Sequence, residues 1–130
     1  MATLTTTLTL ASTDASSDVL SMTVTDALTV VSPIINISKI TATTTGGDNI
    51  IVPNLDSPRY VYLKHTGLNS AGSSSGSDKV VVETADGTQI IELKLGEFAF
   101  FPFYAGGAGK LQLQTSANTV QVEYAYFTRG

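Results

Sequence analysis

The chain has 130 residues, the size of one domain, which is enough to bury a hydrophobic core without disulfides. It has no cysteine, 14% charged residues and a net charge of −4, and its seven lysines and arginines are scattered singly. This composition excludes disulfides and thiolate metal sites, and it offers neither a basic stripe for nucleic acid nor a polybasic patch for a membrane. No apolar run approaches the ~18 residues of a transmembrane helix, and the N-terminus lacks the basic start of a signal peptide, so we expect a soluble protein made in the cytoplasm of its producer.

The first thirty-odd residues of the chain differ from the rest. They are rich in threonine and serine, and their aspartates precede the first basic residue, Lys39. One interpretation is an edge strand, a loop and a second strand of the domain itself. The other is an extended arm that adds a strand to a neighbouring subunit, where backbone hydrogen bonds would give the affinity. In the second case the sparse leucines Leu4, Leu8 and Leu10 are the predicted contact residues of the arm.

β-Branched residues dominate the chain, and apolar and polar residues alternate with the period of two that is typical of half-buried strands. The alternation is clear in VLSMTVT (19–25), RYVYLKH (59–65), TQIIELKL (88–95), KLQLQ (110–114) and TVQVEYAYF (119–127). We predict an all-β fold, an antiparallel β-sandwich or jelly-roll-like domain of about eight or nine short strands with an extended N-terminal arm. Residues 1–33 are assigned to the arm or swapped strands and residues 34–130 to the β-sandwich domain.

Glycine-containing turns separate these strands. Asp86-Gly87 predicts a tight hairpin with a type I′ turn, which requires a positive φ at both central residues. Gly46-Gly47 and Gly106-Gly107 predict two further turns. The low-complexity stretch NSAGSSSGSD (69–78) is predicted to be a mobile loop that does not pack.

The residue patterns that would support catalysis are missing from the sequence. The glycine-rich stretch at 105–110 ends in Lys110 followed by Leu111, whereas a phosphate-binding loop needs serine or threonine there. His65 is the single histidine, and a surface or strand-end role is favoured over catalysis. Zinc needs three or four nitrogen, sulfur or oxygen ligands, and one histidine without cysteine supplies too few. We therefore predict no catalytic residue, no cofactor and no metal.

Half of the aromatic residues lie within seven positions of FAFFPFY (98–104). A bulge near Pro102 would place Phe98 and Phe100 in the core and turn Phe101, Phe103 and Tyr104 elsewhere. One interpretation is that all five rings belong to the core. The other is that Phe101, Phe103 and Tyr104 form an apolar interface with another protein, since aromatic residues are enriched at interface centres.

Three segments of the C-terminal half resemble the small β-rich virion structural proteins of tailed bacteriophages, namely the head decoration (cement) proteins and related accessory proteins. The segments are RYVYLK (59–64), KLGEFAFFP (94–102) and VQVEYAYF (120–127). In such proteins a Y-V-Y-L-K strand precedes a hairpin, a G-E-F-A-F corner and a closing V-x-V-E-Y strand. The resemblance covers about 70 residues, and its motifs are structural.

This resemblance implies a non-enzymatic protein at the capsid surface of a virion, made in the host cytoplasm. It implies that the chain binds the major capsid protein and assembles with itself, commonly as a homotrimer, without nucleic acid or membrane. The arm would then join subunits, and the aromatic residues would contact the shell or a sister subunit. Two alternatives stay open, a tail or fibre component of the virion and a carbohydrate-binding β-sandwich that stacks sugars on Tyr60, Tyr62 or Tyr104.

Overall fold

The computed structural model describes residues 1–31, 37–53, 57–104 and 109–130. Within these ranges the chain forms ten strands, all paired antiparallel, and one short 3₁₀ turn. The prediction of an all-β, sandwich-like fold is confirmed. Two strands form a separate hairpin and eight form the sandwich. The predicted boundary between residues 33 and 34 lies outside the described residues.

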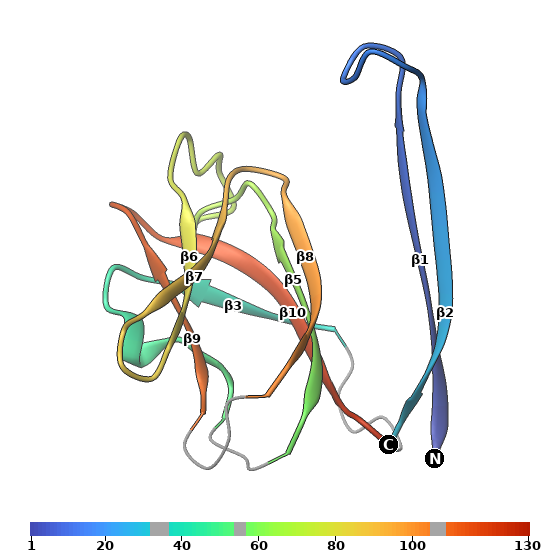
Figure 1. The fold of residues 1–130 in the computed structure, drawn as a ribbon. Coiled ribbons are helices and arrows are strands. Elements are labelled where there is room, and N and C mark those ends of the chain that lie inside the picture. Colours follow the sequence, from blue (N-terminus) through green and yellow to red (C-terminus); the bar gives the residue numbers. More distant parts are fainter. Residues whose placement is uncertain (32–36, 54–56, 105–108) are drawn as a thin grey trace.

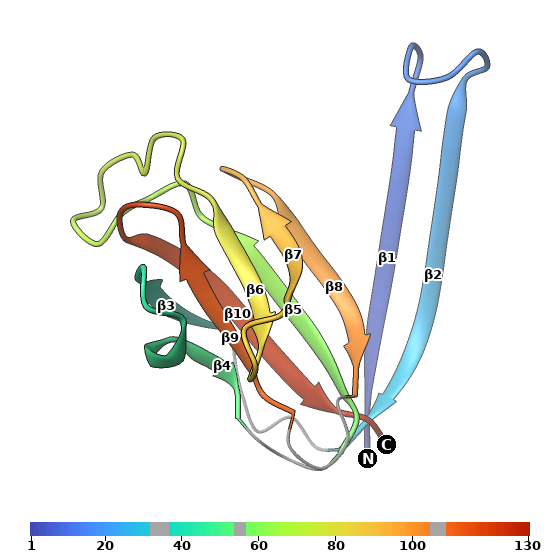
Figure 2. The same ribbon diagram turned by 60° about the vertical axis from the view of Figure 1, so that its left-hand side comes forward.

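The hairpin consists of β1 (Ala2–Ser12) and β2 (Leu20–Val30), which pair over their whole length. It stands beside the sandwich, and the described residues of the two parts join near its base, where both termini of the chain lie (Figures 1 and 2). There the amide of Val31 donates to the Thr128 carbonyl, and the amide of Gly130 donates to the Thr29 carbonyl, each at 2.9 Å. The hairpin is therefore attached at one end and projects from the sandwich along the rest of its length.

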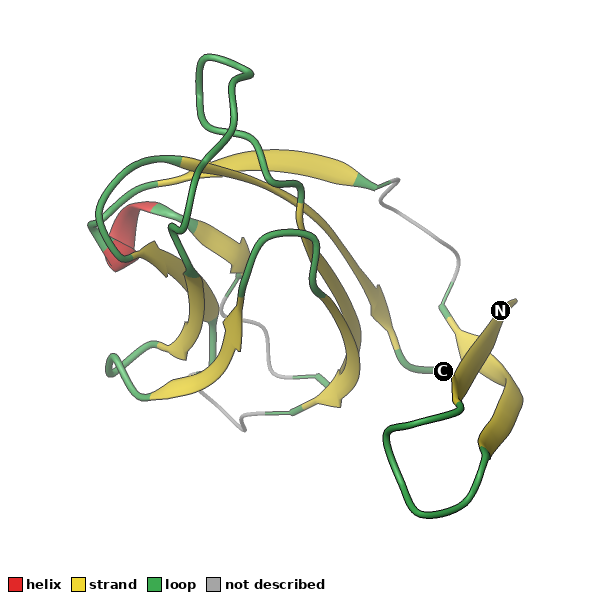
Figure 3. Ribbon diagram, turned by 90° about the horizontal axis from the view of Figure 1, so that it is seen from above, coloured by secondary structure: helices red, strands yellow, loops and turns green. Residues whose placement is uncertain are grey.

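The sandwich consists of two four-stranded sheets with the orders β3-β10-β5-β8 and β4-β9-β6-β7. Seen from above, the sheets curve around a common interior and the hairpin lies to one side (Figure 3). The elements are β3 (Ser38–Ala42), η1 (Gly46–Asp48), β4 (Ile50–Val52), β5 (Arg59–His65), β6 (Val80–Thr84), β7 (Gln89–Leu93), β8 (Phe98–Phe103), β9 (Leu111–Thr115) and β10 (Val120–Thr128).

The core follows from the alternation along the central strands. In β5 the side chains of Val61 and Leu63 point inward and are fully buried, while Tyr60 and Tyr62 point to the outer face. Burial of one such aliphatic side chain stabilises the fold by about 1.5–3 kcal/mol. The fully buried aliphatic side chains of the sandwich also include Ile51, Val80, Val82, Leu111, Leu113, Val120 and Val122. None of these core residues comes from the hairpin, so the sandwich has a core of its own.

The turns agree only in part with the prediction. Asp86-Gly87 does join β6 and β7, but Asp86 has a negative φ and only Gly87 is left-handed, at +84°. The Gly87 amide donates to the Thr84 carbonyl, which closes a type I-like turn before the left-handed glycine. The predicted type I′ turn is therefore wrong. Gly46-Gly47 falls in η1, and Gly106-Gly107 lies outside the described residues.

The serine-rich loop 69–78 is mostly exposed, as expected for a loop that does not pack, but local hydrogen bonds hold its base. Leu68 and Ser74 form a β-bridge, and the side-chain oxygen of Asn69 accepts hydrogen bonds from two loop amides. Ser75 and Asp78 are buried at the base of the loop. Polar side chains that bond to nearby backbone replace the apolar contacts that this composition lacks.

Candidate interaction surface

The hairpin separates its apolar and polar residues onto two faces. Its register pairs Leu8 with Val24 and Leu10 with Met22, and because alternate residues of a strand point the same way, the apolar pairs share one face. The opposite face carries threonine pairs. We call the apolar side the hairpin face, which consists of Leu4, Leu8, Leu10, Leu20, Met22, Val24 and Leu28.

The hairpin face is poorly covered within one copy of the chain. Leu8, Leu10 and Met22 are 44%, 42% and 41% exposed, and Val24 is 53% exposed. A two-stranded hairpin is marginally stable in water, and it normally needs a further layer against its apolar side. The predicted contact residues Leu8 and Leu10 therefore lie on an uncovered surface, whereas Leu4, close to the base, is half-buried.

The outer face of the sheet β3-β10-β5-β8 is also apolar. Cross-strand rows place Phe100 beside Tyr62 and Phe98 beside Lys64, and the rings of Tyr60 and Phe100 stack with centroids 6.1 Å apart. Phe98 is 62% exposed. We call this surface the aromatic face, which consists of Tyr60, Tyr62, Phe98, Phe100 and Phe127.

The predicted orientation of the 98–104 aromatics is wrong. Phe101 and Phe103 pack edge to face against each other and against the core, while Phe98 and Phe100 point outward. β8 pairs with β5 in an unbroken register, so no bulge shifts the alternation. Since β8 is the edge strand, Pro102 can lack an amide donor without interrupting the sheet.

The structure contradicts the first interpretation of the aromatic cluster and leaves the second as a prediction. The five rings are not all core, because Phe98 and Phe100 are exposed. The predicted interface residues Phe101 and Phe103 are half-buried on the inner side, which makes them supports of β8. Tyr104 follows the end of β8 and is 62% exposed. A contact role for these three residues stays a prediction.

The hairpin face and the aromatic face lie opposite each other across a groove. A cavity of about 730 Å³ is lined by Leu8 and Val24 from the hairpin and by Phe98 and Phe100 from β8, among others. A second cavity of about 210 Å³ lies nearer the base, between Leu4 and the aromatic face. The groove therefore has two apolar walls that do not close on each other.

Charged groups border the aromatic face. One cross-strand row of this sheet consists of Lys39, Glu123 and Lys64. The Arg129 guanidinium lies 5.3 Å from the centre of the Tyr60 ring. Burial and the neighbouring Glu123 carboxylate raise the pKa of Tyr62 above its ordinary value. The border thus carries more positive than negative side chains.

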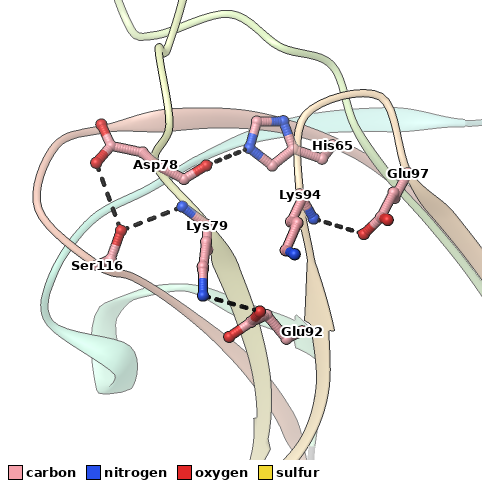
Figure 4. A network of polar contacts seen from close by, with 7 residues as sticks. All are labelled: His65, Asp78, Lys79, Glu92, Lys94, Glu97 and Ser116. Carbon is pink, nitrogen blue, oxygen red and sulfur yellow. Dashed lines mark hydrogen bonds and ion pairs between the residues drawn. The ribbon is translucent and has the colours of Figure 1, made fainter.

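His65 has a structural position, inside the sandwich and not on its surface. It ends β5, as predicted, but it is fully buried. Its Nδ1 accepts a hydrogen bond from the Gly67 amide at 3.0 Å, so Nε2 carries the proton and donates to the Asp78 carbonyl oxygen at 2.9 Å. The imidazole therefore links Gly67, just before the serine-rich loop, to Asp78 at its end, and Figure 4 shows the contact with Asp78.

The neighbouring polar side chains also bond within the fold. The Asp78 carboxylate accepts from Ser116 and Asn118, and Lys79 forms an ion pair with Glu92 at 3.1 Å (Figure 4). In the described part of the chain, no group of three or more histidine, cysteine or carboxylate side chains could hold a metal ion. Within the same ranges, the structure contains no helix that could span a lipid bilayer.

A scan against protein-family models and searches of curated proteins and of solved structures found no match to this chain.

Proposed function

We propose that this chain is a non-enzymatic structural protein of a tailed-phage virion, which binds and stabilises the head shell as a decoration protein. The observation that carries the proposal is the uncovered apolar groove between the hairpin face and the aromatic face. Large exposed apolar surfaces on soluble proteins mark sites of association, because leaving them in water costs free energy and invites aggregation. The resemblance of three segments to phage virion proteins supplies the proposed setting.

The arrangement suits a protein that works by association. The sandwich has its own core, so it can stay folded while the hairpin and the aromatic face contact other chains. Exposed aromatic rings such as Phe98 provide large contact areas with little loss of side-chain freedom. The major capsid protein is the proposed partner in the shell, and the tail or fibre remains the alternative location.

A carbohydrate-binding module is the second candidate, and one feature favours it. A polar cavity of about 430 Å³ lies at the serine-rich loop, lined by Asn69, Ser75, Asp78 and Asn118 among others. The buried Ser75 hydroxyl has no hydrogen-bond partner, so it is available to a ligand hydroxyl. Among the described residues, no tyrosine or phenylalanine lines this cavity, whereas sugar sites usually combine polar groups with a ring, so this candidate comes second. Binding on a glycan array that is lost in Asp78→Ala would favour it.

The copy number of the chain in purified virions tests the proposed function. Hundreds of copies per particle would indicate head decoration, and a few to a dozen would indicate the tail. A matched pair of variants tests the surface. Phe98→Asp is expected to lower shell occupancy at least tenfold, because it places a carboxylate in the apolar groove. Ile90→Asp changes a residue of β7 that is 44% exposed and lies outside the groove, and it should bind normally. Equal occupancy of the two variants would contradict the proposal.

A further inference from the structure

We propose that the hairpin face of one copy packs on the aromatic face of a second copy of this chain. The proposal rests on the proposed function, since it names the chain itself as the first partner of the apolar groove. Four properties of the two faces support it: their length, their attachment, their composition and their charge.

The hairpin is too long to be covered by its own sandwich. β1 and β2 have eleven residues each, which corresponds to about 37 Å, while the six residues of β8 span about 20 Å. In Figures 1 and 2 the tip of the hairpin extends beyond the end of β8. Leu10, Leu20 and Met22 lie toward that tip, are about two-fifths exposed, and do not line the groove. Closing the groove within one copy would leave these three side chains in water.

The attachment of the hairpin leaves both faces accessible. The backbone contacts between the hairpin and the rest of the chain are at its base, around Val30 and Arg129. Above the base, Val24 and Phe98 face the same groove yet remain 53% and 62% exposed. One copy therefore presents two apolar surfaces at once. A second copy can cover both surfaces reciprocally without a third molecule, and closed symmetry would limit the size of the assembly.

The composition of the two faces is complementary. The hairpin face consists of aliphatic side chains and methionine, and the aromatic face consists of flat rings with Ala125 between them. Aliphatic side chains pack closely against the faces of aromatic rings, and methionine adapts to irregular gaps. Two hairpin faces packed together would leave both aromatic faces uncovered, so the contact of each hairpin face with the aromatic face of the other copy covers more apolar surface.

The charges of the two elements have opposite signs. Residues 1–31 contain three aspartates and no lysine or arginine. One of them, Asp26, lies on the same side as the hairpin face, opposite Thr6. Covering this carboxylate with an apolar surface alone would remove its hydration without replacing it, so its partner surface needs a cation. The aromatic face is bordered by Lys39, Lys64 and Arg129, which can supply it.

The test uses the absence of native cysteine. Two differently tagged copies of the full chain, one carrying Val24→Cys and the other Phe98→Cys, are coexpressed and oxidised mildly. Both sites are more than half exposed, so the sandwich should stay folded with either substitution. We expect a disulfide between the two tags. The control pair of Thr25→Cys with Phe98→Cys should give at least tenfold less of this disulfide, because Thr25 lies on the opposite side of the hairpin.

The double variant Val24→Cys/Phe98→Cys distinguishes the two possible packings. If it forms its disulfide only within one chain, and the coexpressed single variants form none between chains, the hairpin covers its own sandwich and the proposal is overturned. Equal cross-linking from positions 24 and 25 would also overturn it. A chain that stays monomeric yet binds shells contradicts this inference and leaves the proposed function intact. A cross-linked oligomer that never occurs on particles contradicts the proposed function and leaves this inference intact.

Discussion

Phe98→Ala separates association from folding more clearly than any other single change. Full burial of a phenylalanine contributes about 3 kcal/mol at most. The Phe98 side chain is 62% exposed in one copy. Its burial therefore stabilises the fold by about 1 kcal/mol, and contact with a partner can add about 2 kcal/mol to the free energy of association. A loss of 2 kcal/mol per contact raises a dissociation constant roughly 30-fold.

Leu63→Ala is the matched reference for the fold. Leu63 is fully buried in the core, and truncation of such a leucine costs about 2–5 kcal/mol of unfolding free energy. The two variants should therefore behave in opposite ways. Phe98→Ala should lose association with a small change in stability, and Leu63→Ala should lose stability while its folded fraction associates normally.

The assay combines urea unfolding with sedimentation velocity over a range of protein concentrations, and shell binding is measured in parallel. A drop in stability for Phe98→Ala as large as that for Leu63→Ala would refute the reasoning, because it would place Phe98 in the core. Unchanged association and unchanged shell binding of Phe98→Ala would also refute it, because Phe98 would then contribute to no contact with a partner.

Two further predictions concern turns of the sandwich. Hydrogen bonds from Thr84 and Thr88 lower the pKa of the exposed Asp86 carboxyl to about 2. The stability that the ionised carboxylate contributes is therefore present above the ordinary pKa near 3.8 and is lost as the pH falls through 2. NMR titration of the Asp86 carboxyl carbon measures this pKa, and an ordinary value would contradict the prediction. A methyl group at Gly46 would collide with the buried Glu83 carboxylate, so Gly46→Ala should lower the unfolding free energy by about 1–3 kcal/mol. Gly47 has open space around it, so Gly47→Ala should change the unfolding free energy far less. Equal effects of the two variants in urea unfolding would contradict the close contact between η1 and Glu83.

The sandwich was predictable from the sequence because its strands alternate cleanly. RYVYLKH matches β5 residue for residue, and its valine and leucine point inward as the period of two requires. The strand predicted at 119–127 differs from β10 by one residue at each end. Such segments need no tertiary information, since only one phase of the alternation buries the aliphatic side chains.

The hairpin and β8 were harder to predict, for two physical reasons. In β1 threonine occurs on both faces, and threonine fits either side of a strand, so the alternation of Leu4, Leu8 and Leu10 was diluted. In β8 aromatic residues occupy both phases, and the inward phase is shown only by the pairing with β5, where Ala99 lies opposite the buried Leu63. A bulge at Pro102 was plausible from local sequence, yet an edge strand accommodates proline without one.

His65 and the serine-rich loop show what a single sequence does not reveal. The sequence places His65 at a strand end but contains no signal for the long-range contact between its imidazole and Asp78. The same contact holds the base of a loop that is otherwise mostly exposed. Side-chain to backbone hydrogen bonds of this kind depend on the tertiary arrangement, so composition alone did not predict them.

Hydrogen exchange of the amides in β1 and β2 shows whether other chains cover the apolar groove. Protection of residues 2–12 and 20–30 should rise with protein concentration or on addition of shell protein, and Val24→Asp should remove this rise while Thr25→Asp keeps it. Exchange of the hairpin at one rate at every concentration, with and without shells, would mean that no other chain covers the groove.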